Sequence, residues 1–272
     1  MSWRRVFQRA GWLDSVGIVG VIVVTLLALT AQWIAPFDPM LRVAPAYLPP
    51  SAVHWFGTDE IGRDMLSRVL IGVQATWLPA LGVISVSLVV GSTVGIVAGA
   101  VGGWVDAVVQ RMVDLFLVLP STVIVLAVVA VLGPGLINAM VALMIFWWSW
   151  YARISRDEVR RLVARPHYEA ARISGAQPRR LVLRYLLPGV VPSLLIAATI
   201  DVANVVIVMS LMSFLGLGQP APAAELGAMT SRALESLTVY WWLPILPAAA
   251  ILVICLFANL AGDGLRSALR GA

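Results

Sequence analysis

The sequence predicts an all-α, polytopic membrane protein with six transmembrane helices. Three observations predict this class: the composition, six long apolar runs, and an uneven distribution of arginine. Of the 272 residues, 60% are hydrophobic and 12% are charged, whereas soluble domains have roughly 45–50% apolar and about 25% charged residues. One water-soluble core of this size cannot bury so much apolar surface, which excludes a soluble globular protein.

Each apolar run is expected to form one membrane-spanning helix. A hydrocarbon layer roughly 30 Å thick requires about 20 apolar residues per helix, because backbone polar groups in lipid must pair within their own segment. The fourth run is the shortest and ends in aromatic residues that suit the membrane interface. The six predicted spans are 16–35, 76–101, 112–132, 136–151, 190–214 and 240–261.

The arginines predict the orientation of these spans. Arg4, Arg5 and Arg9 precede the first span, and no small-residue cleavage site clearly follows it, so it is a signal anchor. With an internal N-terminus, 15 arginines lie on the inner side and 4 on the outer side. Because basic residues concentrate in cytoplasmic loops, both termini are expected on the cytoplasmic side of the membrane.

The basic residues also exclude a class of enzyme. All 19 are arginines, and a phosphate-binding P-loop needs a lysine after its glycine turn. ATP-driven work therefore requires a partner, and we expect no catalytic residues in this chain. The lone Cys255 cannot form an internal disulfide, and His54 and His167 are too far apart to predict a metal site.

Residues 36–75 form the larger outer segment. Thr58 has the properties of a helix N-cap, and two acidic residues follow it. Apolar residues then recur at helical spacing, which predicts an amphipathic helix lying on the outer surface. We therefore divide the chain into an N-terminal part, 1–75, and a transmembrane domain of five helices, 76–272. The first part holds the tail, the first span and this outer segment.

The inner loop 152–189 carries the most specific pattern. Glu169, Ala170 and Ala171 are followed at fixed spacings by Gly175, Tyr185, Leu187 and Pro188. This pattern resembles the EAA signature of the integral membrane permeases of ATP-binding-cassette (ABC) importers, with Tyr185 where isoleucine is usual. Small alanines permit close approach, a glycine lets the chain reverse, and Glu169 and Arg172 can pair with charges on a partner. A merely topogenic basic loop would explain the arginines but not the rest of the pattern.

Five further segments are similar to the dipeptide, oligopeptide and nickel branch of these permeases: 57–64, 102–106, 132–135, 213–218 and 262–266. The resemblance implies a type I ABC importer permease fold with 152–189 as its coupling loop. It also implies a second homologous permease subunit, two cytoplasmic ATP-binding subunits that bind ATP and Mg²⁺, and an extracytoplasmic substrate-binding protein. No cofactor is implied for this chain, and nucleic acid is not an expected partner.

One acidic residue lies deep in a predicted span. A carboxylate at mid-span costs about 2.5 kcal/mol or more, so Asp201 is expected to face protein or water. Asn204 shares its helical face, and Met209 and Met212 follow within two turns. These four residues are candidates for a translocation path, and an interhelical hydrogen bond is the alternative with equal support.

The predicted function is that of a permease subunit which passes a small solute, either nickel or a metal chelate, or a di- or oligopeptide. A short N-terminal tail and Asp201 favour nickel or a chelate. The alternative is a secondary transporter driven by an ion gradient, which usually shows an inverted repeat and several buried charges. Glycines at 91, 95 and 99 predict close helix packing in the second span.

Overall fold

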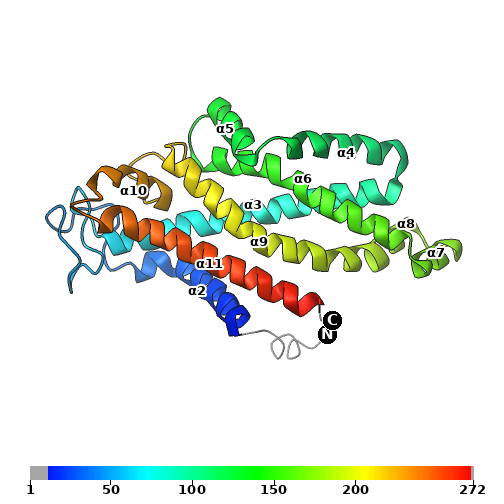
Figure 1. Cartoon of the computed structure of the whole chain (residues 1–272), viewed down its shortest axis with the longest axis horizontal. Helices are drawn as coiled ribbons and strands as arrows, with labels where there is room; N and C mark the ends of the chain where they lie inside the picture. The colour runs from blue at the N-terminus through cyan, green and yellow to red at the C-terminus, as the bar shows by residue number, and fades with distance from the viewer. Residues whose placement is uncertain (1–11, 271–272) are drawn as a thin grey trace.

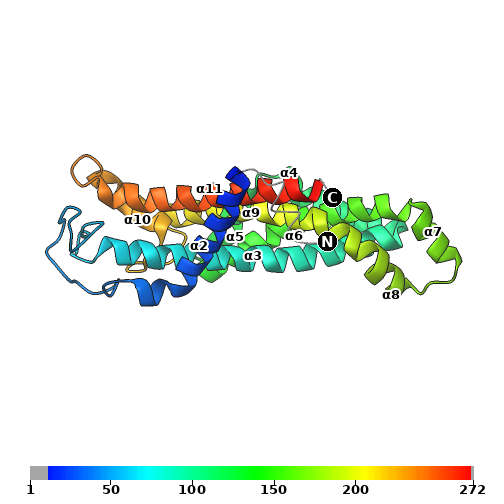
Figure 2. The same ribbon diagram turned by 90° about the horizontal axis from the view of Figure 1, so that it is seen from below.

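The computed structural model describes residues 12–270, and they form an elongated bundle of helices (Figure 1). The predicted charges Arg4, Arg5 and Arg9 lie outside the described residues. Both views show α7 and α8 at one end of the bundle, here called the α7 end. Residues 35–64 and α10 lie at the opposite end, the α10 end (Figures 1 and 2). This arrangement confirms the predicted all-α class.

Within residues 12–270, five long helices build the bundle, and shorter elements connect them. In chain order the long helices are α2 (Trp12–Ile34), α3 (Met65–Val101), α6 (Leu136–Val163), α9 (Leu187–Phe214) and α11 (Trp242–Arg270). The shorter elements are α4 (Gly103–Val118), α5 (Ser121–Leu132), α7 (Pro166–Ile173), α8 (Pro178–Leu181), the π-helical turn η1 (Val182–Leu186), α10 (Leu226–Arg232) and the 3₁₀ turn η2 (Leu234–Ser236).

Within the described residues, four continuous helices are long and apolar enough to cross a membrane. They are α2, α3, α11 and the helix that runs through residues 178–214. The α4–α5 pair supplies a fifth candidate span. A count of six also needs α6, whose apolar part is short and whose second half is rich in arginine.

The expected continuous span 112–132 is wrong, because the chain bends by 91° between α4 and α5. Helix α4 ends at Val118, and Leu119 is extended with φ −87° and ψ 145°. Pro120 explains the break, since its ring disfavours a helical conformation in the preceding residue and it has no N–H to donate.

The expected surface helix beginning at Thr58 is also wrong. Asp64 caps α3 by accepting a hydrogen bond from the Ser67 backbone N–H, and α3 then continues for 37 residues. Thr58 instead lies in the loop, where its hydroxyl donates to the Pro45 carbonyl. The first turns of α3 bury Met65 inside the protein because the loop and α10 cover them. A division at residue 75 therefore falls inside α3, and the two-part organisation stays a prediction.

Close approach between α3 and α6 is confirmed at the predicted glycines. A Cβ added to Gly91 would clash with the Trp148 carbonyl, and one added to Gly95 would clash with Ser155 Oγ and the Ala152 carbonyl. These are rigid atoms of a neighbouring helix, so any side chain would push the helices apart.

Replacing Gly95 with alanine is expected to lower the stability of the solubilised protein by about 1–3 kcal/mol, because α3 and α6 must separate to accept one methyl group. Gly82 in the same helix is the matched control, since a Cβ there would lie 3.5 Å from the flexible end of Met140. Thermal unfolding in detergent measures both variants. Equal melting temperatures for Gly95→Ala and Gly82→Ala would contradict the packing argument.

Candidate functional site

The inner loop folds into two short helices joined by a tight turn. Helix α7 starts at Pro166, whose fixed φ suits the first helical position. It ends at Ile173, and the hydroxyl of the next residue, Ser174, donates to the Ala170 carbonyl. Gly175 then adopts φ +76°, a left-handed conformation that favours glycine, and reverses the chain toward Pro178 at the start of α8.

Buried aromatic and aliphatic side chains fix α7 to the bundle. Tyr168 is 6% exposed and belongs to the same buried cluster as Leu162 of α6 and Leu181 of α8. Tyr185 stacks on His167 with ring centroids 6.3 Å apart. It also lines a depression between α7 and α8, together with Ala171 and Gly175. The aromatic residue at this position of the motif therefore packs within the loop.

The outer face of α7 points away from the bundle and mixes charge with apolar surface. Arg172 donates to Glu169 across 2.7 Å, and both side chains are largely exposed. Ala170 is exposed, and Ile173 is 77% exposed. Exposed apolar residues ringed by charge at a projecting tip are typical of a surface that another protein covers. Leu187 and Pro188 lie apart from this face, at the start of α9, where both are exposed.

The four predicted path residues are distributed over different environments. Asp201 is 8% exposed, and its Oδ1 accepts a hydrogen bond from Asn204 at 3.3 Å. Asn204 itself is exposed, whereas Met209 and Met212 are buried in the core. Helix α9 therefore presents Asn204 to the surface and turns both methionines inward.

Asp201 also faces polar groups of α6. Its Oδ2 and the Tyr151 hydroxyl are both buried without a well-formed hydrogen bond. Tyr151 and Trp150 lie close enough to the carboxylate for their polar groups to act on it. A buried polar atom without a partner is costly and rare in native structures, and these two groups, one on α6 and one on α9, are each other's nearest candidates for a hydrogen bond.

Asp114 pairs with Arg153 of α6 and accepts a hydrogen bond from Gln110. Arg153 follows the apolar part of α6 directly, so this ion pair joins α4 to α6 and does not lie within α4 alone.

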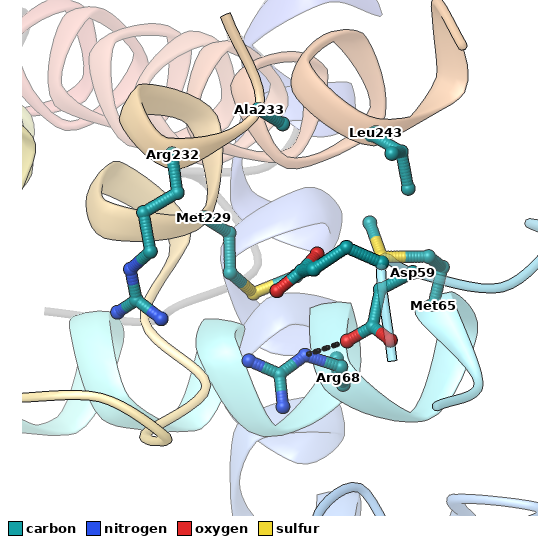
Figure 3. A pocket seen from close by; sticks show the side chains of 8 residues that line it. Asp59, Met65, Arg68, Met229, Arg232, Ala233 and Leu243 are labelled. Atoms are coloured by element: carbon teal, nitrogen blue, oxygen red, sulfur yellow. Dashed lines mark ion pairs between the residues drawn. The ribbon is translucent and has the colours of Figure 1, made fainter. Parts of the chain in front are cut away.

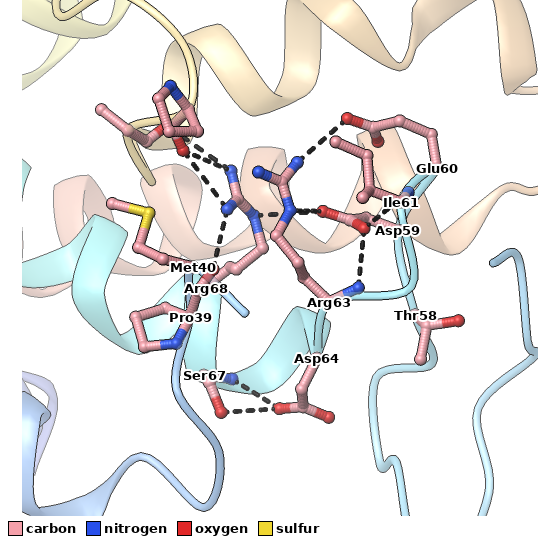
Figure 4. Close-up of polar contacts among 12 residues, drawn as sticks. Pro39, Met40, Thr58, Asp59, Glu60, Ile61, Arg63, Asp64, Ser67 and Arg68 are labelled. Atoms are coloured by element: carbon pink, nitrogen blue, oxygen red, sulfur yellow. Dashed lines mark hydrogen bonds and ion pairs between the residues drawn. The ribbon is translucent and has the colours of Figure 1, made fainter. Parts of the chain in front are cut away.

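A second polar cluster, at the α10 end, was not predicted. Figure 4 shows Arg68 at its centre, with its guanidinium aimed at backbone carbonyls. Arg68 is 2% exposed. It donates to the carbonyls of Pro39 and Pro222, and its Nε lies 3.5 Å from Asp59 Oδ2. Arg63 also binds Asp59 through its Nε. The cluster joins the outer loop, α3 and the segment before α10.

A small cavity lies beside this cluster (Figure 3). Arg68 and Asp59 form one wall, and Met229 and Arg232 of α10 approach from the other side. The sequence drew attention to 57–64, but the carbonyl partners of Arg68 lie 29 and 154 positions away. A carbonyl leaves no mark in a sequence, so no signal pointed to these contacts.

The fold defines a helical membrane subunit with a folded loop at the α7 end of the bundle. Residues 91–271 match the family described as the inner membrane component of binding-protein-dependent transport systems. The chain belongs to this family, the permeases of ABC importers.

Several relatives resemble nearly the whole chain, and their names give different cargoes. The probable D,D-dipeptide transport system permease protein DdpC of Escherichia coli strain K12 is 36% identical over 92% of this chain and 84% of its own length. The nickel transport system permease protein NikC of the same strain is 35% identical over 97% of this chain and 95% of its own length. The di/tripeptide transport system permease protein DppC of Pseudomonas aeruginosa is 35% identical over 98% of this chain and 90% of its own length.

A solved structure supports the fold. The inward-facing MetNI methionine ABC transporter matches 75% of this chain and 97% of its own chain with a TM-score of 0.60 at 22% identity. Family membership makes the chain a non-catalytic, multi-pass inner membrane subunit of an ATP-driven transporter, with ATP hydrolysis in partner subunits. The alternative of a secondary transporter gains no support.

Proposed function

We propose that this chain passes a small solute into the cytoplasm and that the exposed face of α7 receives the force for transport from an ATP-binding subunit. The observation that carries the proposal is the α7 tip, where Glu169, Arg172 and Ile173 are presented beyond the bundle on a firmly packed base. The small side chains of Ala170 and Ala171 let a partner protein approach the α7 backbone closely, as insertion of α7 into a groove requires.

The charge distribution supports a cytoplasmic α7 end. Nine arginines occur from Arg153 to Arg184, in the half of α6 nearest α7 and in the loop itself. Far fewer occur at the α10 end, where Arg63 and Arg68 are used in internal contacts. Positive charge concentrates on the cytoplasmic side of membrane proteins, so both termini lie there and α10 faces the extracytoplasmic binding protein.

The proposed partners are those that membership of the ABC importer permease family implies. A second homologous permease subunit completes the membrane unit, and two ATP-binding subunits hold ATP and Mg²⁺. ATP changes the equilibrium between inward-facing and outward-facing arrangements only through its different affinity for the two. The segment from α7 to η1 connects α6 to α9, so a movement of α7 caused by ATP binding is transmitted to both helices.

Asp201 and Asn204 are proposed to contribute to the translocation path. Asn204 is exposed on α9 and holds one Asp201 oxygen, so the carboxylate lies directly behind a polar surface position. Met209 and Met212 support this part of α9 from the core. A carboxylate behind this polar position favours a cationic group in the solute, and nickel or a metal chelate is the proposed cargo.

Uptake by the complete transporter in proteoliposomes tests this function. With ATP inside the cytoplasmic compartment and the cognate binding protein outside, we expect uptake of nickel or a nickel chelate that stops when ATP is withheld. Dipeptides presented in the same way test the other cargo. Uptake that follows an ion gradient and persists without the ATP-binding subunits would overturn the proposal.

A further inference from the structure

Helix α4 buries little of its surface against the bundle. Within α4, only Asp106 and Val113 are buried. Apolar side chains on its other faces are open, with Val118 80% exposed and Trp104 77% exposed. Figure 1 shows α4 along the edge of the bundle, beside the half of α6 that leads to α7.

Both ends of α4 are breaks in the chain. Gly102 and Gly103 connect it to α3 with φ of +69° and +59°, and the space around both is open. At the other end, the extended Leu119 precedes the 91° bend into α5. Neither α3 nor α5 continues the backbone hydrogen bonds of α4. Because of these two breaks, α4 can change its position as a rigid helix.

Ion pairs at two acidic residues of α4 and a ring contact, Phe116 against Trp148 at 5.7 Å between centroids, connect α4 to α6, and the pair at Asp106 has the most specific geometry. Asp106 Oδ1 accepts from Arg156 Nε at 2.7 Å, and Asp106 Oδ2 accepts from Arg156 Nη2 at 2.8 Å. Arg160, one turn further along α6, lies 3.6 Å from the same carboxylate. A forked pair fixes orientation as well as distance, and the 8% exposure of the Asp106 side chain protects it from water.

The other partner in this contact lies on the helix that leads to the loop. Arg156 and Arg160 belong to α6, which continues unbroken to Val163, three residues before α7 begins. Any displacement of α7 that tilts this part of α6 therefore acts on Asp106 directly. Asp114 and Arg153 form a second ion pair between the two helices, later in α4 and earlier in α6.

We propose that the Asp106–Arg156 pair makes α4 move together with α6, so that force applied at α7 reaches α4 and α5. Asp106 and Arg156 are positioning residues in this account. The proposal rests on the function given above and adds a route by which the loop acts on a loosely packed part of the membrane unit. The competing explanation is that the Asp106–Arg156 pair only stabilises the fold and transmits no movement.

The first test is Asp106→Asn in the complete transporter. We expect the ATP-binding subunits to associate normally and to hydrolyse ATP, while solute uptake per ATP falls about 10-fold, within the range usual for coupling between sites. Asp157→Asn is the matched control, since Asp157 binds the same Arg156 at 3.0 Å from within α6 and joins no second helix. Unchanged uptake per ATP in Asp106→Asn would overturn the proposal. The Glu169→Lys variant tests the docking surface separately. If the ATP-binding subunits still associate normally with that variant, the proposed function fails, whatever the result for Asp106→Asn.

A covalent link provides a second test that does not depend on how well the asparagine variant folds. Cysteines replace Asp106 and Arg156 in a Cys255→Ala background and are joined by a bifunctional thiol reagent of side-chain length. If the two helices move as one, the linked protein regains uptake per ATP relative to the unlinked one. If transport needs α4 to move against α6, the link blocks uptake and the proposal is wrong.

Discussion

Gly175→Arg is expected to lose tight association with the ATP-binding subunit and to lose ATP-dependent uptake with it. Gly175 has φ +76°, which costs other residues about 1–2 kcal/mol, and the new side chain occupies the tip next to Ile173 and Arg172. Disrupting the centre of an interface typically costs about 2 kcal/mol or more, which is roughly 30-fold in affinity. Co-purification and titration of the ATP-binding subunit measure the effect, and Glu169→Lys is expected to act in the same direction.

Gly216 provides a matched control for this substitution. It has φ +80°, and, like Gly175, it has no atom within 4 Å of the added Cβ. Gly216→Arg therefore carries the same backbone strain but lies after α9, far along the chain from α7. We expect it to bind the ATP-binding subunit normally. Equal losses in both variants would attribute the effect to strain and contradict a docking role for α7.

Arg68→Met is expected to cause the largest loss of stability, about 3–5 kcal/mol, because one partner of a buried ion pair is removed. Arg68 is 2% exposed, and its removal leaves the carbonyls of Pro39 and Pro222 without their donor. Asp59 keeps Arg63 but loses the second cation beside it. Thermal unfolding of the detergent-solubilised protein measures the difference.

Arg232→Met is the control for this prediction. Arg232 lines the same cavity from α10 but is exposed, so its loss is expected to change stability by about 0.5 kcal/mol or less (Figure 3). A similar melting temperature for Arg68→Met and Arg232→Met would show that the cluster contributes little to holding the α10 end together.

The apolar runs predicted the long helices well because lipid solvation leaves a strong mark on composition. The run 190–214 lies within α9, and the run 240–261 matches most of α11. The bend at Pro120 was missed because apolar residues continue on both sides of it. Apolar residues at helical spacing predict a helix, but they do not distinguish burial in the membrane surface from burial in the protein. The first turns of α3 were therefore predicted as a surface helix.

The loop at α7 was predictable because its signal is local: residues 169–175 are close in the sequence and fold together. Polar contacts between distant segments were not predictable. Asp106 and Arg156 are 50 positions apart, and many arginines were equally good partners before the fold was known. Asp201 was found as an unusual residue, but only the fold shows that it faces Tyr151 and not open space.

Cross-linking from a cysteine at Ala170 tests the central claim most directly. Ala170 is exposed on α7, and a Cys255→Ala background leaves the new thiol as the sole cysteine in this chain. In membrane vesicles holding the whole transporter, the account predicts an adduct with the ATP-binding subunit whose yield changes when ATP is added. An adduct with the extracytoplasmic binding protein, or labelling of this thiol by an impermeant reagent in intact cells, would contradict it.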